Sequence, residues 1–156
     1  MATKVQTRLT TKQLDCNFCQ SVFEAHAPRV QALCDWMASS SNEAQAISME
    51  IFVQCFRQLS SMPDGEAVEI LDRQMIGVFQ DRYFRPTAIV EESAPSQADE
   101  MRSAIRSMAP MERLVFLLHD VYGYAVSRVA ELTGLGEKEC CRSVFQGRMH
   151  VRAALA

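Results

Sequence analysis

The sequence predicts an all-helical (all-α) protein built from two small helical domains joined by a linker. Apolar residues recur at helical spacing along nearly the whole chain, as at Val30, Leu33, Cys34 and Met37, and no useful stretch alternates like a strand. Clusters of proline, glycine and serine separate the periodic stretches. Of the 156 residues, 48% are hydrophobic and 22% are charged, a balance typical of a folded chain.

The first domain is expected over residues 10–85. Pro28 is predicted to interrupt the first helix and to open the second, because the first position of a helix tolerates proline. Residues 39–42 break the pattern and supply caps for a third helix. A turn at residues 63–65 precedes a fourth helix, which ends near Arg85. The inward positions of the third and fourth helices are Ala44, Ile47, Ile51, Cys55, Leu59, Val68, Leu71, Met75, Val78 and Phe79.

Residues 86–96 are expected to form the linker, because they contain two prolines, two serines and little apolar content at their end. The second domain, residues 97–156, starts with one helix and continues with another opened by Pro110. A short helix then leads to a tight turn at residues 134–136, where two glycines flank a leucine. The last helix runs from about residue 137 to residue 154.

Charge is unevenly distributed along the chain. Residues 1–95 carry 8 basic and 12 acidic side chains, whereas residues 96–156 carry 8 basic and 7 acidic ones. An acidic front and a more basic end fit a protein that contacts DNA through its C-terminal part, although a chance distribution gives the same pattern. The N-terminus is polar, and no apolar run approaches the length of a membrane span, so a cytoplasmic protein without membrane insertion is expected.

The cysteines and histidines favour neither a metal site nor an enzyme. Cys16 and Cys19 with Cys34 or His26 could suggest zinc, but a structural zinc site usually draws its four ligands from two separated pairs. Reduced thiols on helices are therefore expected, with no metal and no cofactor. The three histidines lie far apart in the sequence, and no nucleophile–base pair or phosphate loop is visible, so no catalytic residue is assigned.

The segment 120–152 carries the functional prediction. A short helix, a glycine-bearing turn of three residues and a longer helix have the spacing of a helix-turn-helix, whose second helix lies in the major groove of DNA. A helical hairpin used only for packing is the alternative. Cys140, Val144, Gly147 and Val151 are expected to face inward. The residues expected to bind DNA are Ser127, Arg128, Lys138, Glu139, Cys141, Arg142, Phe145, Gln146, Arg148 and Arg152.

Two stretches of this segment resemble a known family. Residues 110–123 have the sequence PMERLVFLLHDVYG, and residues 129–135 have the sequence VAELTGL. Both resemble the C-terminal domain (region 4) of extracytoplasmic-function sigma factors, bacterial transcription proteins of the sigma-70 family. The front of the chain resembles region 2 of that family more weakly, through FEAHAPRV at residues 23–30 and EIFVQCF at residues 50–56.

The resemblance implies a sigma factor that binds core RNA polymerase and directs transcription initiation at promoter DNA. Region 4 would bind the −35 element, and region 2 would dock on polymerase and melt the −10 element; an anti-sigma factor is a further possible partner. The family's docking pair is replaced by Ala46 and Met49, so polymerase contact is expected through Glu43, Glu50 and Arg57 on the exposed side of that helix.

Other positions also depart from the family pattern. The stretch for −10 recognition lacks its usual tryptophan, Ala125 stands where a capping hydroxyl is usual, and Cys141 and Ser143 stand where basic residues are frequent. The alternative is a degenerate sigma-like protein that acts as a DNA-binding regulator, or as a protein-interaction partner, without opening promoters.

Overall fold

The computed structural model describes residues 15–61, 66–84 and 100–156, and in these ranges it contains helices and no strand. This confirms the all-helical prediction for those residues. The elements in chain order are α1 (Cys16–Met37), α2 (Ser41–Ser61), α3 (Ala67–Tyr83), α4 (Glu100–Ser107), α5 (Pro110–Phe116), the π-helical turn η1 (Leu117–Val121), α6 (Val126–Thr133) and α7 (Glu137–Ala154).

The prediction that Pro28 opens a new helix is wrong. Pro28 lies inside α1, which is continuous for 22 residues. A proline in a helix interior loses one hydrogen bond and costs about 3 kcal/mol. Burial offsets this cost, because Val22 before the proline and Val30 after it are both buried, while Pro28 itself is exposed.

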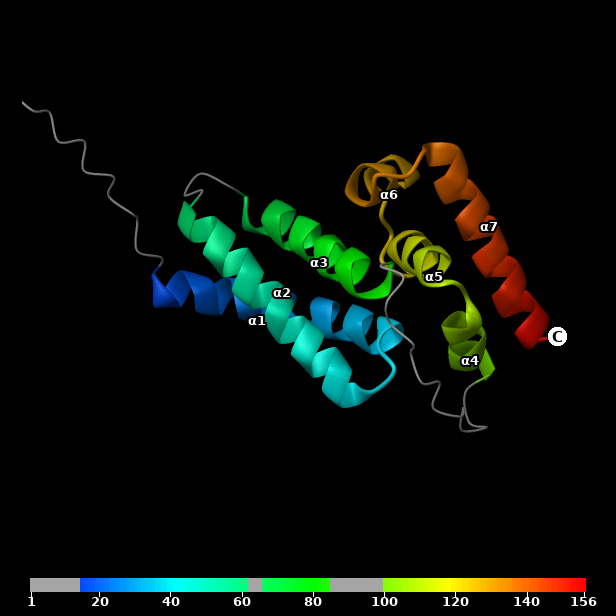
Figure 1. The fold of residues 1–156 in the computed structure, drawn as a ribbon, viewed down its shortest axis with the longest axis horizontal. Coiled ribbons are helices and arrows are strands. Elements are labelled where there is room, and N and C mark those ends of the chain that lie inside the picture. The colour runs from blue at the N-terminus through cyan, green and yellow to red at the C-terminus, as the bar shows by residue number, and fades with distance from the viewer. Residues whose placement is uncertain (1–14, 62–65, 85–99) are drawn as a thin grey trace, which may run out of the picture.

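The helices α1, α2 and α3, called here the front helices, pack closely on one another (Figure 1). Nine of the ten inward positions predicted for the third and fourth helices of the sequence are buried; the exception is Val68, in the first turn of α3, which is 45% exposed. The break predicted at residues 39–42 is confirmed in part: residues 38–40 separate α1 from α2, but α2 already begins at Ser41. The Ser40 hydroxyl oxygen accepts a hydrogen bond from the Glu43 amide at 3.2 Å, as expected of a cap.

The C-terminal helices, α4 to α7, form a second group in which α7 packs mainly on α5 (Figure 1). Gly147 makes this approach possible. A Cβ atom built on Gly147 would lie 2.6–2.9 Å from three atoms of the Phe116 side chain, closer than carbon atoms pack. Cys140, Val144 and Gly147 are buried and Val151 is half-buried, so the predicted inward face of this helix is confirmed.

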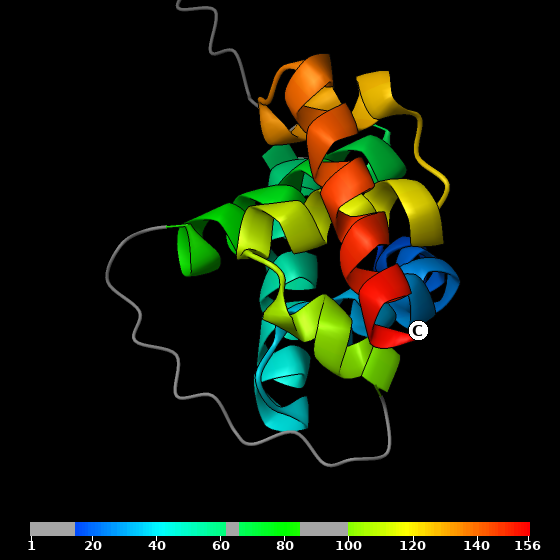
Figure 2. The same ribbon diagram turned by 90° about the vertical axis from the view of Figure 1, so that its right-hand side faces the viewer.

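The two groups of helices touch, because α1 contacts α4 and α5, and α3 contacts α6. Buried apolar residues of both groups belong to one continuous cluster, which includes Leu33, Phe79, Ile105 and Leu118. Packing within each group is nevertheless more extensive than packing between them. Figure 2 shows α7 on the side of the molecule that is turned away from the front helices.

The proposed linker, residues 86–96, lies outside the described residues. Among the described helices, none combines the length and the apolar character required to traverse a bilayer.

Candidate nucleic-acid interface

The turn between α6 and α7 is held by local hydrogen bonds. Gly134 ends α6 in the left-handed region (φ 74°), and its amide donates to the Ala130 carbonyl at 2.9 Å, a common helix C-cap. The Thr133 hydroxyl is buried and donates to the Val129 carbonyl at 2.7 Å. The Gly136 amide donates to the Glu139 carboxylate at 3.1 Å at the start of α7. These bonds fix the direction in which α7 leaves the turn.

One face of α7 is exposed to solvent. Phe145 is 63% exposed and Met149 is 48% exposed, although large apolar side chains are usually buried. The cations on this face, Lys138, Arg142 and Arg152, form no ion pair with any other residue that the structure describes. The exposed residues of the face are Lys138, Cys141, Arg142, Phe145, Gln146, Met149 and Arg152. The predicted outer face of the helix is thereby confirmed, and it combines cationic, apolar and amide groups.

Arg128 does not project freely from α6. Its guanidinium pairs with Glu69 of α3 and, at 2.9 Å, with Glu131 of its own helix. Arg73 of α3 completes the cluster, because it lies 2.6 Å from Glu69 and 2.9 Å from Glu131. We call these four residues the α3–α6 ion-pair cluster. The hydrogen bond from Arg128 is the main cause that lowers the pKa of Glu69 below its usual value.

Arg148 is also held by a carboxylate. Its guanidinium donates two hydrogen bonds of 2.7 Å to Asp120, in the bidentate geometry that binds carboxylates most strongly. The same hydrogen bonding lowers the pKa of Asp120. Of the remaining residues expected to bind DNA, Glu139 caps α7, and Ser127 is exposed in the first turn of α6.

A buried carboxylate joins α3 to the C-terminal helices. Asp72 is only 3% exposed. It accepts hydrogen bonds from Arg29 at 2.9 Å and from the Tyr124 hydroxyl at 3.0 Å, while Arg29 also donates to the Tyr124 oxygen. The Arg128 guanidinium lies 3.9 Å from the second carboxylate oxygen of Asp72. A buried charge requires such partners, because desolvation otherwise costs several kcal/mol.

The patterns in the sequence predicted no role for Asp72, Arg29, Tyr124 or Glu69. Asp72 follows Leu71 and precedes Met75 on the apolar face of α3, and a charged residue at such a position was the available signal. Its partners come from segments 43 and 52 residues away in the sequence, which periodicity does not bring together.

The residues expected to dock polymerase are only partly on an open surface. Glu43 is half-buried, and its carboxylate accepts hydrogen bonds from the Ser39 amide and the Tyr83 hydroxyl. The Glu50 carboxylate lies 3.2 Å from Arg82 of α3. The expectation of an exposed position is therefore wrong for Glu43, which faces α3, and right for Arg57, which is exposed.

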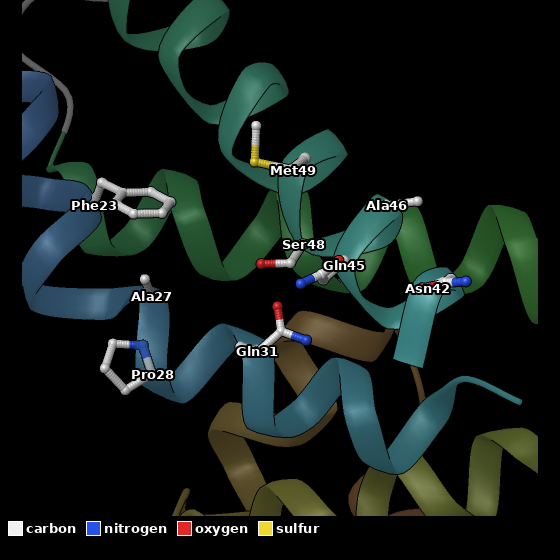
Figure 3. Close-up of a pocket in the computed structure, with 9 residues that line it drawn as sticks. All are labelled: Phe23, Ala27, Pro28, Gln31, Asn42, Gln45, Ala46, Ser48 and Met49. Carbon is white, nitrogen blue, oxygen red and sulfur yellow. The ribbon is translucent and has the colours of Figure 1, made fainter. Parts of the chain in front are cut away.

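A groove lies on the surface between α1 and α2, lined by residues of both helices (Figure 3). Phe23 and Ala27 line it from α1, and Ala46 and Met49 line it from α2. Figure 3 shows Gln31, Gln45 and Ser48 grouped at its centre. Ala46 and Met49, the two positions that the sequence resemblance aligned with a docking pair, thus lie on this groove, and Met49 is 59% exposed there.

The cysteines are free thiols. Cys34, Cys55 and Cys140 are buried, whereas Cys16 and Cys141 are exposed. Burial is the largest cause that raises the pKa of Cys34 to about 12 and that of Cys55 to about 11. Within residues 15–61, 66–84 and 100–156, no group of three or more histidine, cysteine or carboxylate side chains is arranged to hold a metal ion.

No protein-family model matches this chain, and no curated protein matches it.

Proposed function

We propose that the protein is a sigma-type transcription initiation factor that binds core RNA polymerase and directs it to promoter DNA. In this proposal residues 10–85 form the polymerase-docking domain, and residues 97–156 form a DNA-binding domain. Helices α6 and α7 then act as a helix-turn-helix, with α7 in the major groove.

The observation that carries the proposal is the solvent-facing side of α7. Helix α7 follows a tight glycine turn and lies on the side of the molecule that is turned away from the front helices. Its outer face presents Gln146 and the cations Lys138 and Arg142, which form no ion pair with other described residues. Arginine binds guanine and glutamine binds adenine through two hydrogen bonds each. Arg142 and Gln146 are four residues apart and therefore project from the same side of the helix.

The exposed apolar residues of this face suit the same role. A thymine methyl group is the apolar feature of the major groove, and Phe145 or Met149 would contact it without leaving a polar group unpaired. Lys138 and Arg152 lie near opposite ends of α7, where the phosphate backbones pass, so they are assigned to phosphate contacts.

The first test is binding-site selection from a random DNA library with wild type, Arg142→Ala and Lys138→Ala. Arg142→Ala should lose the preference at one base position, by about 1–3 kcal/mol. Lys138→Ala should weaken binding to all sequences alike. If Arg142→Ala selects the same sequence as wild type, α7 does not lie in the groove as proposed.

The second test separates the sigma factor from a DNA-binding regulator. The full chain is mixed with core RNA polymerase, co-purified, and used for run-off transcription on genomic fragments. Co-purification with transcripts supports the sigma factor. DNA binding without polymerase supports the regulator, a role favoured by the involvement of Glu43 and Glu50 in contacts within the front helices. Neither activity points to a protein-interaction partner.

The groove between α1 and α2 allows a sharper version of this test. Ala46→Asp with Met49→Gln restores the family's docking pair on the groove and should strengthen polymerase binding. Unchanged or weaker binding would mean that the front helices dock through another surface, or not at all.

A further inference from the structure

We propose that the α3–α6 ion-pair cluster, together with Asp72 and Tyr124, is a latch that holds the C-terminal helices against the front helices and competes with DNA for Arg128. This inference rests on the proposed function, since it concerns the control of the same DNA-binding unit.

The contacts between the two groups of helices combine the shared apolar cluster with several polar contacts. Beyond the ion-pair cluster and the Asp72 hydrogen bonds, the Gln80 side chain of α3 donates to the Thr133 carbonyl at 2.8 Å. The Arg113 guanidinium of α5 donates to the Met37 carbonyl at 3.3 Å. Because the helices contact one another more extensively inside each group than between the groups, breaking polar contacts between the groups should affect their separation before it affects their folds.

Arg128 occupies the central position in the latch. It sits in the first turn of α6, the end of the helix that a helix-turn-helix sets against the DNA backbone. A guanidinium binds a carboxylate and a phosphate through the same planar fork of N–H groups. Glu69 and Glu131 therefore fill the positions that a DNA phosphate would take on Arg128. Arg128 cannot serve both partners at once.

The cluster is weak enough to be displaced. The side chains of Arg73 and Glu131 are about half exposed, and those of Glu69 and Arg128 are 36% and 25% exposed. Ion pairs with this exposure are screened by salt and contribute modestly to stability. A polyanion that binds the open form better than the closed form would shift the population toward the open form.

The test uses the chain's own exposed thiols. Cys16 lies at the start of α1 and Cys141 lies on α7, so nitroxide labels on these two residues report the separation of the two groups. Cys19→Ser is added to every protein, because Cys19 is only half-buried and would otherwise compete for the label. Distances are measured in the full chain by pulsed electron paramagnetic resonance.

Three variants are compared with wild type. Glu69→Gln removes the ion pairs that Glu69 forms with Arg73 and Arg128. Tyr124→Phe removes the hydroxyl that bonds the C-terminal part of the chain to Arg29 and Asp72 of the front helices, and it changes no charge. Asp120→Asn is the matched control, since it breaks a carboxylate–arginine pair that lies entirely within the C-terminal helices.

At low salt, wild type and Asp120→Asn should give one dominant distance. Glu69→Gln and Tyr124→Phe should add a population at longer distance, as should wild type at high salt. The unlabelled Glu69→Gln and Tyr124→Phe proteins should bind a mixed-sequence duplex of about 30 base pairs roughly two- to five-fold more tightly than wild type. Tyr124→Phe is decisive here, because a change in net charge cannot explain its tighter binding.

The latch is overturned if Glu69→Gln and Tyr124→Phe keep the wild-type distance, or if Asp120→Asn changes the distance as much as they do. A longer distance without tighter DNA binding refutes the competition for Arg128. If no form binds DNA, wild type included, the proposed function fails and the competition with it, while the distances still decide whether the ion pairs close the molecule.

Discussion

Whether Gly147→Ala stabilises or destabilises the protein depends on how closely α7 approaches Phe116 at this position. Gly147→Ala removes the flexibility of a glycine inside a helix, which alone would stabilise the protein by up to about 1 kcal/mol. The new methyl group, however, would lie 2.6, 2.8 and 2.9 Å from Cδ2, Cγ and Cβ of Phe116. Overpacking of this kind costs about 1–3 kcal/mol. Because Phe116 Cβ is fixed to the backbone, turning the ring does not relieve the contact, so the upper part of that range applies.

The net expectation is a loss of about 1–2 kcal/mol in the free energy of unfolding, or a fall in Tm of roughly 2–8 °C. Gly77→Ala is the matched control, since Gly77 also lies inside a helix, α3, and a Cβ there meets nothing within 4 Å. It should raise Tm by up to about 4 °C. Urea and thermal unfolding followed by circular dichroism measure both. A Gly147→Ala protein as stable as Gly77→Ala would refute the packing of α7 on Phe116.

Iodoacetamide should alkylate Cys16 and Cys141 in the native protein. Cys34 and Cys55 are buried and have pKa values of about 12 and 11, so they should react only on unfolding. Bound DNA should slow the reaction of Cys141 but not that of Cys16, and equal protection of both would contradict the placement of α7. The slope of log affinity against log salt should be about −3, because Lys138 and Arg152 are assigned to phosphates and Arg128 binds a third phosphate once it is released from Glu69. A slope near zero would point to a protein partner instead. Asp120 has a lowered pKa, so its pairing with Arg148 contributes stability that is present above the unfolded value of about 3.9 and is lost as pH falls through the folded value. The stability difference between wild type and Asp120→Asn, measured in urea, should therefore shrink from pH 7 to pH 3, and a constant difference would show that the pair does not contribute.

The periodicity of the sequence was sufficient to place most helices and the two faces of α7. The spacing of apolar residues is a local property of the sequence. Once the start of a helix is known, this spacing shows which of its residues face the core. The last helix was predicted at residues 137–154 and is found there, because the glycines around Leu135 and the run of inward residues after it mark its start and its orientation. The proposed roles in DNA and polymerase binding remain predictions.

Tertiary structure decided the features that depend on two distant segments. Pro28 should have ended α1 by local preference, yet burial on both sides of it outweighs the lost hydrogen bond. Arg128 and Arg148 look like free cations in the sequence, but each finds a carboxylate that only the packing of helices brings near. Glu69 lies 59 residues from Arg128 along the chain. A charge pattern along one helix specifies which side chains face outward; whether a carboxylate of another helix meets them depends on how the helices cross, which local spacing does not encode.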